Sequence, residues 1–400
     1  MTEFKAIGAC GIVLDVHTGE VIALASLPDY DANEFGRASP DERRDRAINS
    51  VFEPGSTFKL QNVSAALDDG VVNVWNGFDA TSPIRAGRYT INDFEGKHRF
   101  LYVPEIIAYS SNIGAAHMAA AVGPERQREW MQKAGMLARV PFELPEAAPP
   151  LVPPVSRWKE LTTMTIGFGQ GIAVTPLHVA VGTATVANGG SRLKPTILAL
   201  DPSDPQPQGV RIMKQATSDT VRKIMRLVVT EGVGKAAEVP GYFVGGKTGT
   251  AQKTAGGHGY KRNARVAAFV GAFPMNAPRY IVYMMVDEPK PNAKSFGYAT
   301  AGWVAAPAAA KVIARAAPML GLLPDTEHAP EIDAELAMPL QPGHPGGGKP
   351  PAAAPPATPV ARATPRLPAA PAGTLQVPVV PVLRDLRHEA HYLVPDHATR

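Results

Sequence analysis

Apolar residues form short β-type runs near the start of the chain and again between residues 243 and 286. The first pair covers residues 11–16 and 20–25 and is separated by "HTG"; three more cover 243–250, 265–273 and 280–286. The stretch "PMNAP" between the last two runs is rich in turn-forming residues, so these two runs are predicted to form a hairpin.

Helix-spaced apolar positions lie between these runs. Residues 56–68 carry apolar side chains at 60, 63 and 67 and stop at Gly70. Residues 218–231 are predicted to begin with Ser218 as the N-cap, and a further helix is predicted over 301–316. Strands at both ends with helices between them predict an α/β chain of the α+β type, in which a five-stranded antiparallel sheet is flanked by helices.

The composition changes near residue 323. Sixteen of the 40 prolines lie in residues 324–400, around "PGHPGGGKPPAAAPPATP". Such a segment buries too little apolar surface to offset the entropy lost on ordering. We therefore predict one folded domain over residues 1–322 and a disordered Pro/Ala-rich tail over 323–400. The stretch "HEAH", His388 to His391, lacks the four-residue spacing of helical zinc ligands and is interpreted as solvated tail.

Charge and cysteine content narrow the function classes. Hydrophobic residues make up 45% of the chain and charged residues 19%, which is typical of a globular protein. The net charge of +4 is spread over mixed signs and does not predict nucleic-acid binding. Cys10 is the only cysteine, which excludes an intramolecular disulfide and favours a small apolar residue in a strand. No metal ion or other cofactor is predicted.

The N-terminal residues lack the basic and apolar segments of a signal peptide. No apolar run approaches the roughly 20 residues of a membrane span. As written, the chain is expected to be soluble and unexported.

The stretch "GYFVGGKTGT", residues 241–250, fits two kinds of site. Gly241, Gly246, Lys247 and Thr248 match the phosphate-binding loop G-x-x-x-x-G-K-[ST], and "IVYMMVDE" resembles a strand that ends in a magnesium-binding carboxylate. A phosphate loop runs directly into a helix, whereas here a glycine-rich stretch and a β-hairpin follow. The pattern therefore favours the alternative, a K-T-G motif of the kind found beside serine nucleophiles in penicillin-acylated enzymes.

A serine nucleophile with its base is predicted in "EPGSTFKL". Ser56 opens a predicted helix, and Lys59 lies three residues further on the same helix face. A serine hydroxyl is barely ionised at neutral pH and needs such a base. Burial beside other cations lowers the pKa of a lysine, and a helix N-terminus favours a developing oxyanion. The other S-x-x-K copies, at Ser156 and Ser191, lack this helical context because prolines flank them.

The stretch "AYSSNIG" provides a second motif. It places Ser110, Ser111 and Asn112 between two helical runs. These residues fit either an S-x-N motif of an acyl-transfer site or a cap for the helix that follows.

A third motif lies on the β-type run that contains Lys247, Thr248, Gly249 and Thr250. A strand that borders a cleft can pair with a peptide, while lysine and threonine side chains bind a carboxylate. Gly249 has no side chain and would let a substrate backbone approach.

The three motifs, in this order and in a helix, loop and strand context, resemble those of the penicillin-recognising serine acyltransferases. The flanking residues are similar to the class B penicillin-binding proteins, in particular the cell-division transpeptidases. The matching stretches are "LDVHTGEVIALASLPDYDAN", "RDRAINSVFEPGSTFKL", "IAYSSNIGAAHMA", "TIGFGQGIAVTPLHVAVGTATVANGG", "GGKTGTAQK" and "AAFVGAFPMNAPRYIVYMMVDEPK", which together cover about residues 8–316.

This resemblance implies a peptidoglycan D,D-transpeptidase that cross-links stem peptides during septal cell-wall synthesis. Ser56 would attack the penultimate D-Ala carbonyl of a D-Ala-D-Ala stem peptide, release the terminal D-Ala and form an acyl-enzyme. An amine of a neighbouring stem peptide would then resolve this intermediate. β-Lactams would acylate Ser56 as substrate mimics, and division-complex proteins would be partners.

The family roles carry over to the matching positions of this sequence. Lys59 would be the base, Ser110 a proton relay and Asn112 a hydrogen-bonding group for substrate and Lys59. Lys247, Thr248 and Thr250 would bind the terminal carboxylate. The backbone amides of Ser56 and Thr250 would form the oxyanion hole.

Family members also carry a membrane span and a non-catalytic domain before this region, which hold the catalytic domain in the periplasm. This chain lacks those segments, so it is expected to be an N-terminally truncated domain. Alternatives remain open: a D,D-carboxypeptidase or β-lactamase of the same chemistry, a non-catalytic or decayed penicillin-binding remnant, and a P-loop nucleotide-binding protein.

Overall fold

A five-stranded antiparallel sheet forms the centre of the computed structural model, which describes residues 1–87, 89–201, 203–254 and 259–342. The strands, in spatial order, are β2 (Val21–Leu27), β1 (Gly8–Asp15), β11 (Tyr280–Asp287), β10 (Tyr260–Phe273) and β9 (Gly245–Thr254). The two ends of the domain therefore meet in one sheet, with Gly8 opposite Asp287. The predicted hairpin is β10–β11, in which Phe273 lies opposite Tyr280. The predicted fold class is confirmed.

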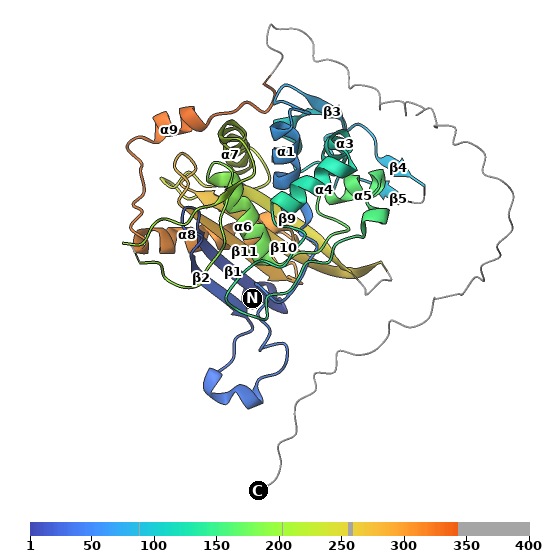
Figure 1. Cartoon of the computed structure of the whole chain (residues 1–400). Helices are drawn as coiled ribbons and strands as arrows, with labels where there is room; N and C mark the ends of the chain where they lie inside the picture. Colours follow the sequence, from blue (N-terminus) through green and yellow to red (C-terminus); the bar gives the residue numbers. More distant parts are fainter. Residues whose placement is uncertain (88, 202, 255–258, 343–400) are drawn as a thin grey trace, which may run out of the picture. The chain divides into compact units, whose positions relative to one another are not determined.

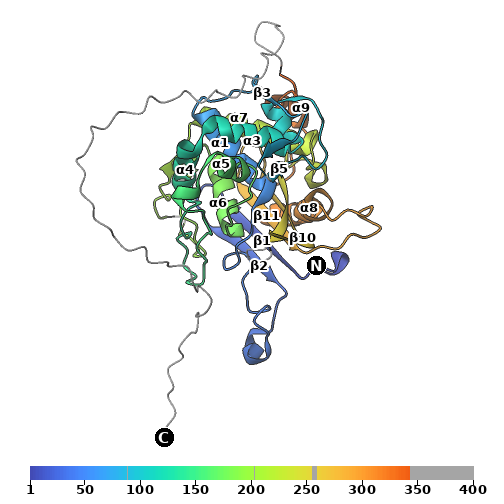
Figure 2. The same cartoon turned by 90° about the vertical axis from the view of Figure 1, so that its right-hand side faces the viewer.

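Helices cover both faces of this sheet (Figures 1 and 2). Successive side chains of a strand point to opposite faces, so Ile12 and Leu14 of β1 join one apolar cluster while Val13 joins the other. Helix α8 (Ala301–Met319) packs on the Val13 face. Helix α6 (Pro176–Ala187), all of whose residues are buried, packs on the other face, where a layer of further helices joins it.

That layer carries the S-x-x-K and S-x-N motifs, while K-T-G lies on β9. Its helices are α1 (Lys59–Asp68), α2 (Val103–Ala108), α3 (Asn112–Val122), α4 (Pro124–Lys133), α5 (Glu160–Ile166) and α7 (Gln215–Thr230). Short strand pairs lie at its periphery: β3 (Gly77–Asp79) with β6 (Phe100–Tyr102), β4 (Ile84–Ala86) with β5 (Tyr89–Ile91), and β7 (Ser191–Arg192) with β8 (Val210–Arg211). Short 3-10 helices complete the described elements: η1 (Thr2–Phe4), η2 (Ala32–Arg37), η3 (Gly55–Phe58), η4 (Val155–Arg157) and η5 (Lys235–Ala237).

Ser218 does not cap a helix, so that prediction is wrong. Helix α7 begins earlier, at Gln215, with Lys214 as its N-cap. The Ser218 hydroxyl instead donates to the carbonyl oxygen of Val186 at 2.6 Å and accepts from the Gly189 amide at 3.1 Å. A serine inside a helix is tolerated here because its hydroxyl binds the backbone at the end of α6.

The described segment that follows the predicted boundary at residue 322 packs on the domain. Helix α9 (Ala329–Leu336) contacts α7, and its buried Ile332 and Leu336 lie one turn apart on the same face. Asp333 pairs with Arg226 of α7 at 3.2 Å. The high proline content of the region concealed this short amphipathic helix. Residues 343–400, with "HEAH", lie outside the described residues.

Replacing Ile332 by alanine tests this packing. We expect the substitution to lower the free energy of unfolding by about 2–4 kcal/mol, since it removes a buried aliphatic side chain and leaves a cavity. Leu323→Ala is the matched control, because Leu323 is 78% exposed and its loss should change stability by no more than about 0.5 kcal/mol. Denaturant titration measures the free energy of unfolding of both variants. Equal changes in the two variants would show that α9 is not packed on the domain.

The fold also accounts for Cys10 and for the apolar segments. Cys10 is buried on β1 within the apolar cluster, as predicted, and burial raises the pKa of its thiol. Across the described ranges, no helix is both long and apolar enough to cross a membrane. The same residues contain no group of three or more His, Cys, Asp or Glu side chains arranged to hold a metal ion.

Candidate active site

Ser56 lies in the tight turn η3, which leads directly into α1. The turn is fixed from below by a second loop, because the Gly55 amide donates to the carbonyl oxygen of Gly169 at 3.0 Å. The two backbones are so close that a Cβ atom on Gly169 would lie 2.0 Å from the Gly55 oxygen. Ser56 stays half-exposed while its neighbours Gly55 and Thr57 are buried. The fold therefore presents this serine at the surface of a rigid turn.

Lys59 lies one turn further along the helix and is fully buried. Its Nζ is 3.0 Å from Oγ of Ser56, 2.6 Å from the carbonyl oxygen of Ser110 and 2.7 Å from Oδ1 of Asn112. Burial first, and then the nearby Lys247, hold the pKa of Lys59 well below its ordinary value, against the opposing effect of Asp93. A neutral amine has two N–H groups and one lone pair. With Ser110 and Asn112 accepting the two N–H groups, the lone pair is left for the Ser56 hydroxyl.

Ser110 bridges two lysines. Its Oγ lies 3.2 Å from Nζ of Lys59 and 2.9 Å from Nζ of Lys247, and its backbone has a positive φ of 61°. Lys247 is fully buried on β9, and burial lowers its pKa to about 7. The predicted residues Ser56, Lys59, Ser110, Asn112 and Lys247 thus form one continuous chain of polar contacts.

Strand β9 forms the wall of the site as an edge strand of the sheet. Gly249 is required by a contact inside the protein, since a Cβ atom there would lie 2.8 Å from Cγ2 of Thr57 and 3.0 Å from the carbonyl oxygen of Pro54. The sequence predicted a role in substrate approach for this glycine, and the structure adds the contact with the serine turn. Thr248 is buried, whereas Thr250 is exposed and its Oγ1 accepts from the Ala301 amide at 3.0 Å, so its own O–H is free to donate.

Two site residues escaped the sequence analysis, Asn92 and Asp93 in the loop after β5. The Asp93 carboxylate accepts from the Ser111 hydroxyl at 2.8 Å, the Asn112 amide at 2.5 Å and the Ile113 amide at 3.0 Å. The Asn92 carbonyl accepts from Nδ2 of Asn112 at 3.0 Å, which turns Oδ1 of that amide towards Lys59. Ser111 is also the N-cap of α3, so the cap interpretation of "SSN" is confirmed, while Ser110 and Asn112 contact Lys59. No motif marks "IND", and only the tertiary contacts reveal it.

Asp93→Asn tests whether this carboxylate acts on Lys59 as well as on the loop. Since the charge of Asp93 raises the pKa of Lys59, its removal should shift the acid limb of the acylation rate to lower pH. The loosened S-x-N loop should also lower the maximal rate by roughly 10- to 100-fold. Asp79→Asn is the control, because the Asp79 carboxylate binds Thr81, accepting from its amide at 2.8 Å and bonding its side chain, and is not among the groups that shift the pKa of Lys59. A lower rate without a shift would leave Asp93 as a helix cap alone.

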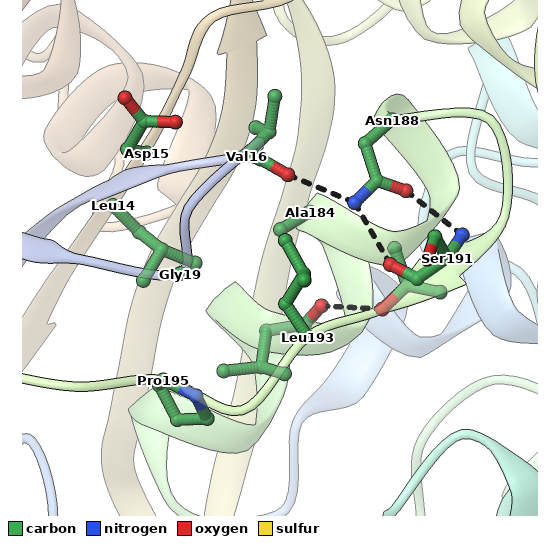
Figure 3. Close-up of a pocket in the computed structure, with 11 residues that line it drawn as sticks. Leu14, Asp15, Val16, Gly19, Ala184, Asn188, Ser191, Leu193 and Pro195 are labelled. Atoms are coloured by element: carbon green, nitrogen blue, oxygen red, sulfur yellow. Dashed lines mark hydrogen bonds between the residues drawn. The ribbon is translucent and has the colours of Figure 1, made fainter. Parts of the chain in front are cut away.

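A small hollow away from this site shows how tightly the domain is packed (Figure 3). It lies between the β1–β2 turn and α6 and offers about 10 Å³, space for roughly one water molecule. Its polar groups bind each other: Nδ2 of Asn188 donates to the carbonyl oxygens of Val16 and Ser191. Because these groups satisfy one another, the hollow has a structural role.

The nucleotide-binding interpretation is contradicted by the structure. Lys247 and Thr248 lie inside β9, which continues to Thr254 and pairs with β10. No helix follows the motif to direct its N-terminal amides at a phosphate. The geometry instead places a buried lysine beside a half-exposed serine, with a second buried lysine on an edge strand.

Residues 9–314 match the penicillin binding protein transpeptidase domain, and the chain belongs to this family. It is 42% identical over 333 residues to the "Probable peptidoglycan D,D-transpeptidase FtsI" of Caulobacter vibrioides, covering 81% of this chain and 56% of that protein. It is 34% identical over 322 residues to the "Probable peptidoglycan D,D-transpeptidase PenA" of Neisseria flavescens, covering 80% and 78%. The chain thus spans little more than half of the Caulobacter relative.

Solved structures agree with this assignment. The transpeptidase domain of Burkholderia pseudomallei penicillin-binding protein 3 superposes with a TM-score of 0.72 at 31% identity, covering 81% of this chain and 92% of that one. Penicillin-binding protein 3 of Mycobacterium tuberculosis, complexed with aztreonam, gives a TM-score of 0.72 at 30% identity, covering 80% and 74%.

Proposed function

We propose that this domain is a serine-type peptidoglycan D,D-transpeptidase that acts in septal cell-wall synthesis. The observation that carries the proposal is the unbroken contact chain from Ser56 through Lys59 and Ser110 to Lys247, beside an edge strand that can pair with a peptide. Its relatives, which are named D,D-transpeptidases, support the same reaction class.

The first half-reaction follows from the contacts of Lys59. The neutral amine takes the Ser56 proton as Oγ attacks the carbonyl carbon of the penultimate D-Ala. The amides of Ser56 and Thr250 hold the developing oxyanion. The peptide bond then breaks, the proton returns through Lys59 and Ser110 to the leaving amine, and terminal D-Ala departs. Ser56 is left as an ester of the stem peptide.

The second half-reaction reverses these roles. An amine of a neighbouring stem peptide attacks the ester, its proton passes to Lys59 and then to Ser56, and a cross-link forms. Lys247, Thr248 and Thr250 bind the terminal carboxylate of the donor peptide. A β-lactam supplies the same carboxylate, but its opened ring stays attached and the acyl-enzyme persists. We place the catalytic domain in the periplasm, held at the inner membrane and working with division-complex proteins, as in the family.

A fluorescent penicillin tests the nucleophile. The purified protein should become covalently labelled, and Ser56→Ala should abolish labelling. Ser64→Ala is the control on the same helix, since the buried Ser64 hydroxyl has no hydrogen-bond partner among the described residues. Labelling that survives Ser56→Ala would exclude this nucleophile. No labelling of the parent protein would favour the non-catalytic remnant.

The fate of the acyl group distinguishes the reactions that share this chemistry. A D-Ala-D-Ala donor peptide incubated with an acceptor amine should give an amide product that mass spectrometry detects. If hydrolysed donor is the sole product at saturating acceptor, the domain is a D,D-carboxypeptidase.

A further inference from the structure

Glu53, three residues before Ser56, has contacts that the proposed reaction does not use. Its side chain is half-buried; Oε1 accepts from the Gly171 amide at 2.9 Å and Oε2 from the Tyr260 hydroxyl at 3.1 Å. No lysine, arginine or histidine of the described ranges pairs with it, and burial raises the pKa of this carboxyl. A carboxylate that loses water without gaining a cation costs stability. Because the position costs stability, the reason that a glutamate lies here is sought in what its two hydrogen bonds connect.

The first bond ties Glu53 to the loop beneath the serine turn. Gly55 already binds this loop through Gly169, and Glu53 binds it two residues further on, at Gly171. Phe52 is paired with Val174 in both directions, each amide donating to the other carbonyl at 3.0 Å. The segment that precedes Ser56 is thus held by hydrogen bonds at Phe52, Glu53 and Gly55.

The second bond reaches the opposite wall of the site. Tyr260 begins β10 and lies opposite Thr254 of β9. The pairing of β10 with β11 ends at Val266, so this part of the β9–β10 hairpin projects beyond the neighbouring strand (Figure 1). Through Tyr260, Glu53 holds the projecting end of the β9–β10 hairpin, whose other strand carries Thr250.

The proposed oxyanion hole makes this link important. Its two amides belong to separate segments, Ser56 to η3 and Thr250 to β9, and both must lie about 2.7–3.1 Å from one oxygen atom. The segments touch closely, since a Cβ atom on Gly55 would lie 3.2 Å from Cβ of Ala251. Van der Waals contact limits their approach but does little to stop them from separating, whereas a hydrogen bond from Tyr260 to Glu53 opposes separation.

We propose that Glu53 is a positioning residue for acylation, which through Gly171 and Tyr260 fixes the distance between the serine turn and β9. The inference rests on the proposed function. Glu53 contacts none of the carboxylate-binding side chains directly, so its loss should lower the acylation rate constant more than it weakens the preceding non-covalent binding of the β-lactam.

Stopped-flow acylation by a fluorescent penicillin over a concentration series separates these two quantities. Tyr260→Phe removes only a hydroxyl from a 41% exposed ring and should lower the acylation rate constant about 5- to 20-fold. Glu53→Ala should lower it at least as much. Glu53→Gln should rescue it to within about threefold, because its amide oxygen still accepts from Gly171 and its NH2 group can donate to the tyrosine oxygen. Tyr30→Phe, on the remote loop after β2, is the matched control.

The double variant decides whether the two side chains act together. With Glu53 already alanine, Tyr260→Phe should have little further effect. If the fold-reduction in the double variant equals the product of the two single fold-reductions, the two side chains act independently and the inference is overturned. An unchanged acylation rate constant in both single variants overturns it too. In either case, labelling of the parent protein would still support the proposed function. If Glu53→Ala does not fold, Tyr260→Phe and Glu53→Gln carry the same test.

Amide hydrogen exchange of the free protein tests the two hydrogen bonds of Glu53 without any reaction. Glu53→Ala should speed exchange at Gly171, and Tyr260→Phe should speed it in the β9–β10 hairpin, relative to Tyr30→Phe. Unchanged exchange at both places would show that the hydrogen bonds of Glu53 to Gly171 and Tyr260 do not hold the two segments together. This outcome is informative even if the parent protein fails to react with penicillin.

Discussion

Lys59→Met is expected to lower the rate of penicillin acylation by a factor of roughly 10⁴ and to leave the fold intact. Methionine keeps an unbranched side chain of similar length but has no lone pair of comparable basicity for the Ser56 proton. In the structure, the contacts of the Lys59 amine leave that lone pair directed at Oγ of Ser56. Single-turnover labelling with a fluorescent penicillin measures the loss.

The stability of this variant separates loss of the base from loss of the fold. Burying a lysine in its neutral form is costly, and methionine removes that cost. It also leaves two half-buried acceptors, the Ser110 carbonyl and Oδ1 of Asn112, without their donor, at up to about 1–3 kcal/mol each. Because the two effects oppose each other, the melting temperature should change little. A labelling rate within tenfold of the parent would show that Lys59 is not the base.

The serine and its base could be predicted from the sequence because their relation is local. A spacing of three residues along a helix places Ser56 beside Lys59 on one face, independently of the rest of the fold. Lys247 could be placed with them only through the resemblance of the ordered motifs. The sequence could not show that the Ser110 hydroxyl lies between the two amines, which depends on how α2, α3 and β9 pack.

Residues without a motif could not be predicted either, because their contacts with the site depend on tertiary packing. Asp93 and Glu53 reach the site through loops, and neither lies at a spacing that periodicity could detect. Helix α9 was missed because composition was averaged over a proline-rich region. Its Pro330 at the first helical turn and the four-residue spacing of Ile332 and Leu336 are helix signals on a shorter scale.

Lys247→Met is expected to abolish efficient acylation and to stabilise the protein at neutral pH. Removing the cation that binds the substrate carboxylate should lower the second-order acylation rate by roughly 10²- to 10³-fold. The stability change follows from the buried position of Lys247 on β9, where its pKa falls from 10.5 to about 7. The unfolded chain keeps an ordinary lysine, so between these two pH values it binds more protons than the folded protein.

The sign of the pH dependence follows from that difference. Stability rises with pH wherever the unfolded state binds more protons, here by up to about 1.4 kcal/mol per pH unit between pH 7 and 10.5. At pH 7 the deprotonation of Lys247 costs at most about 4 kcal/mol. Methionine removes that cost but leaves the Thr248 carbonyl without its donor, at about 1–3 kcal/mol. The net gain should be about 1–3 kcal/mol at pH 7.

Comparing the parent and Lys247→Met by denaturant titration at pH 7 and pH 9 isolates this group, because titrations that are common to both proteins cancel in the difference. The advantage of the variant should shrink as the pH rises, since the proton that the parent gives up on folding costs less free energy to release as the pH approaches 10.5. Lys290→Met, which removes a half-exposed lysine, should show no such trend. A variant that is less stable than the parent at pH 7, or an advantage that does not fall towards pH 9, would mean that Lys247 stays charged in the folded site, held by Ser110 and Thr248 as an ammonium ion.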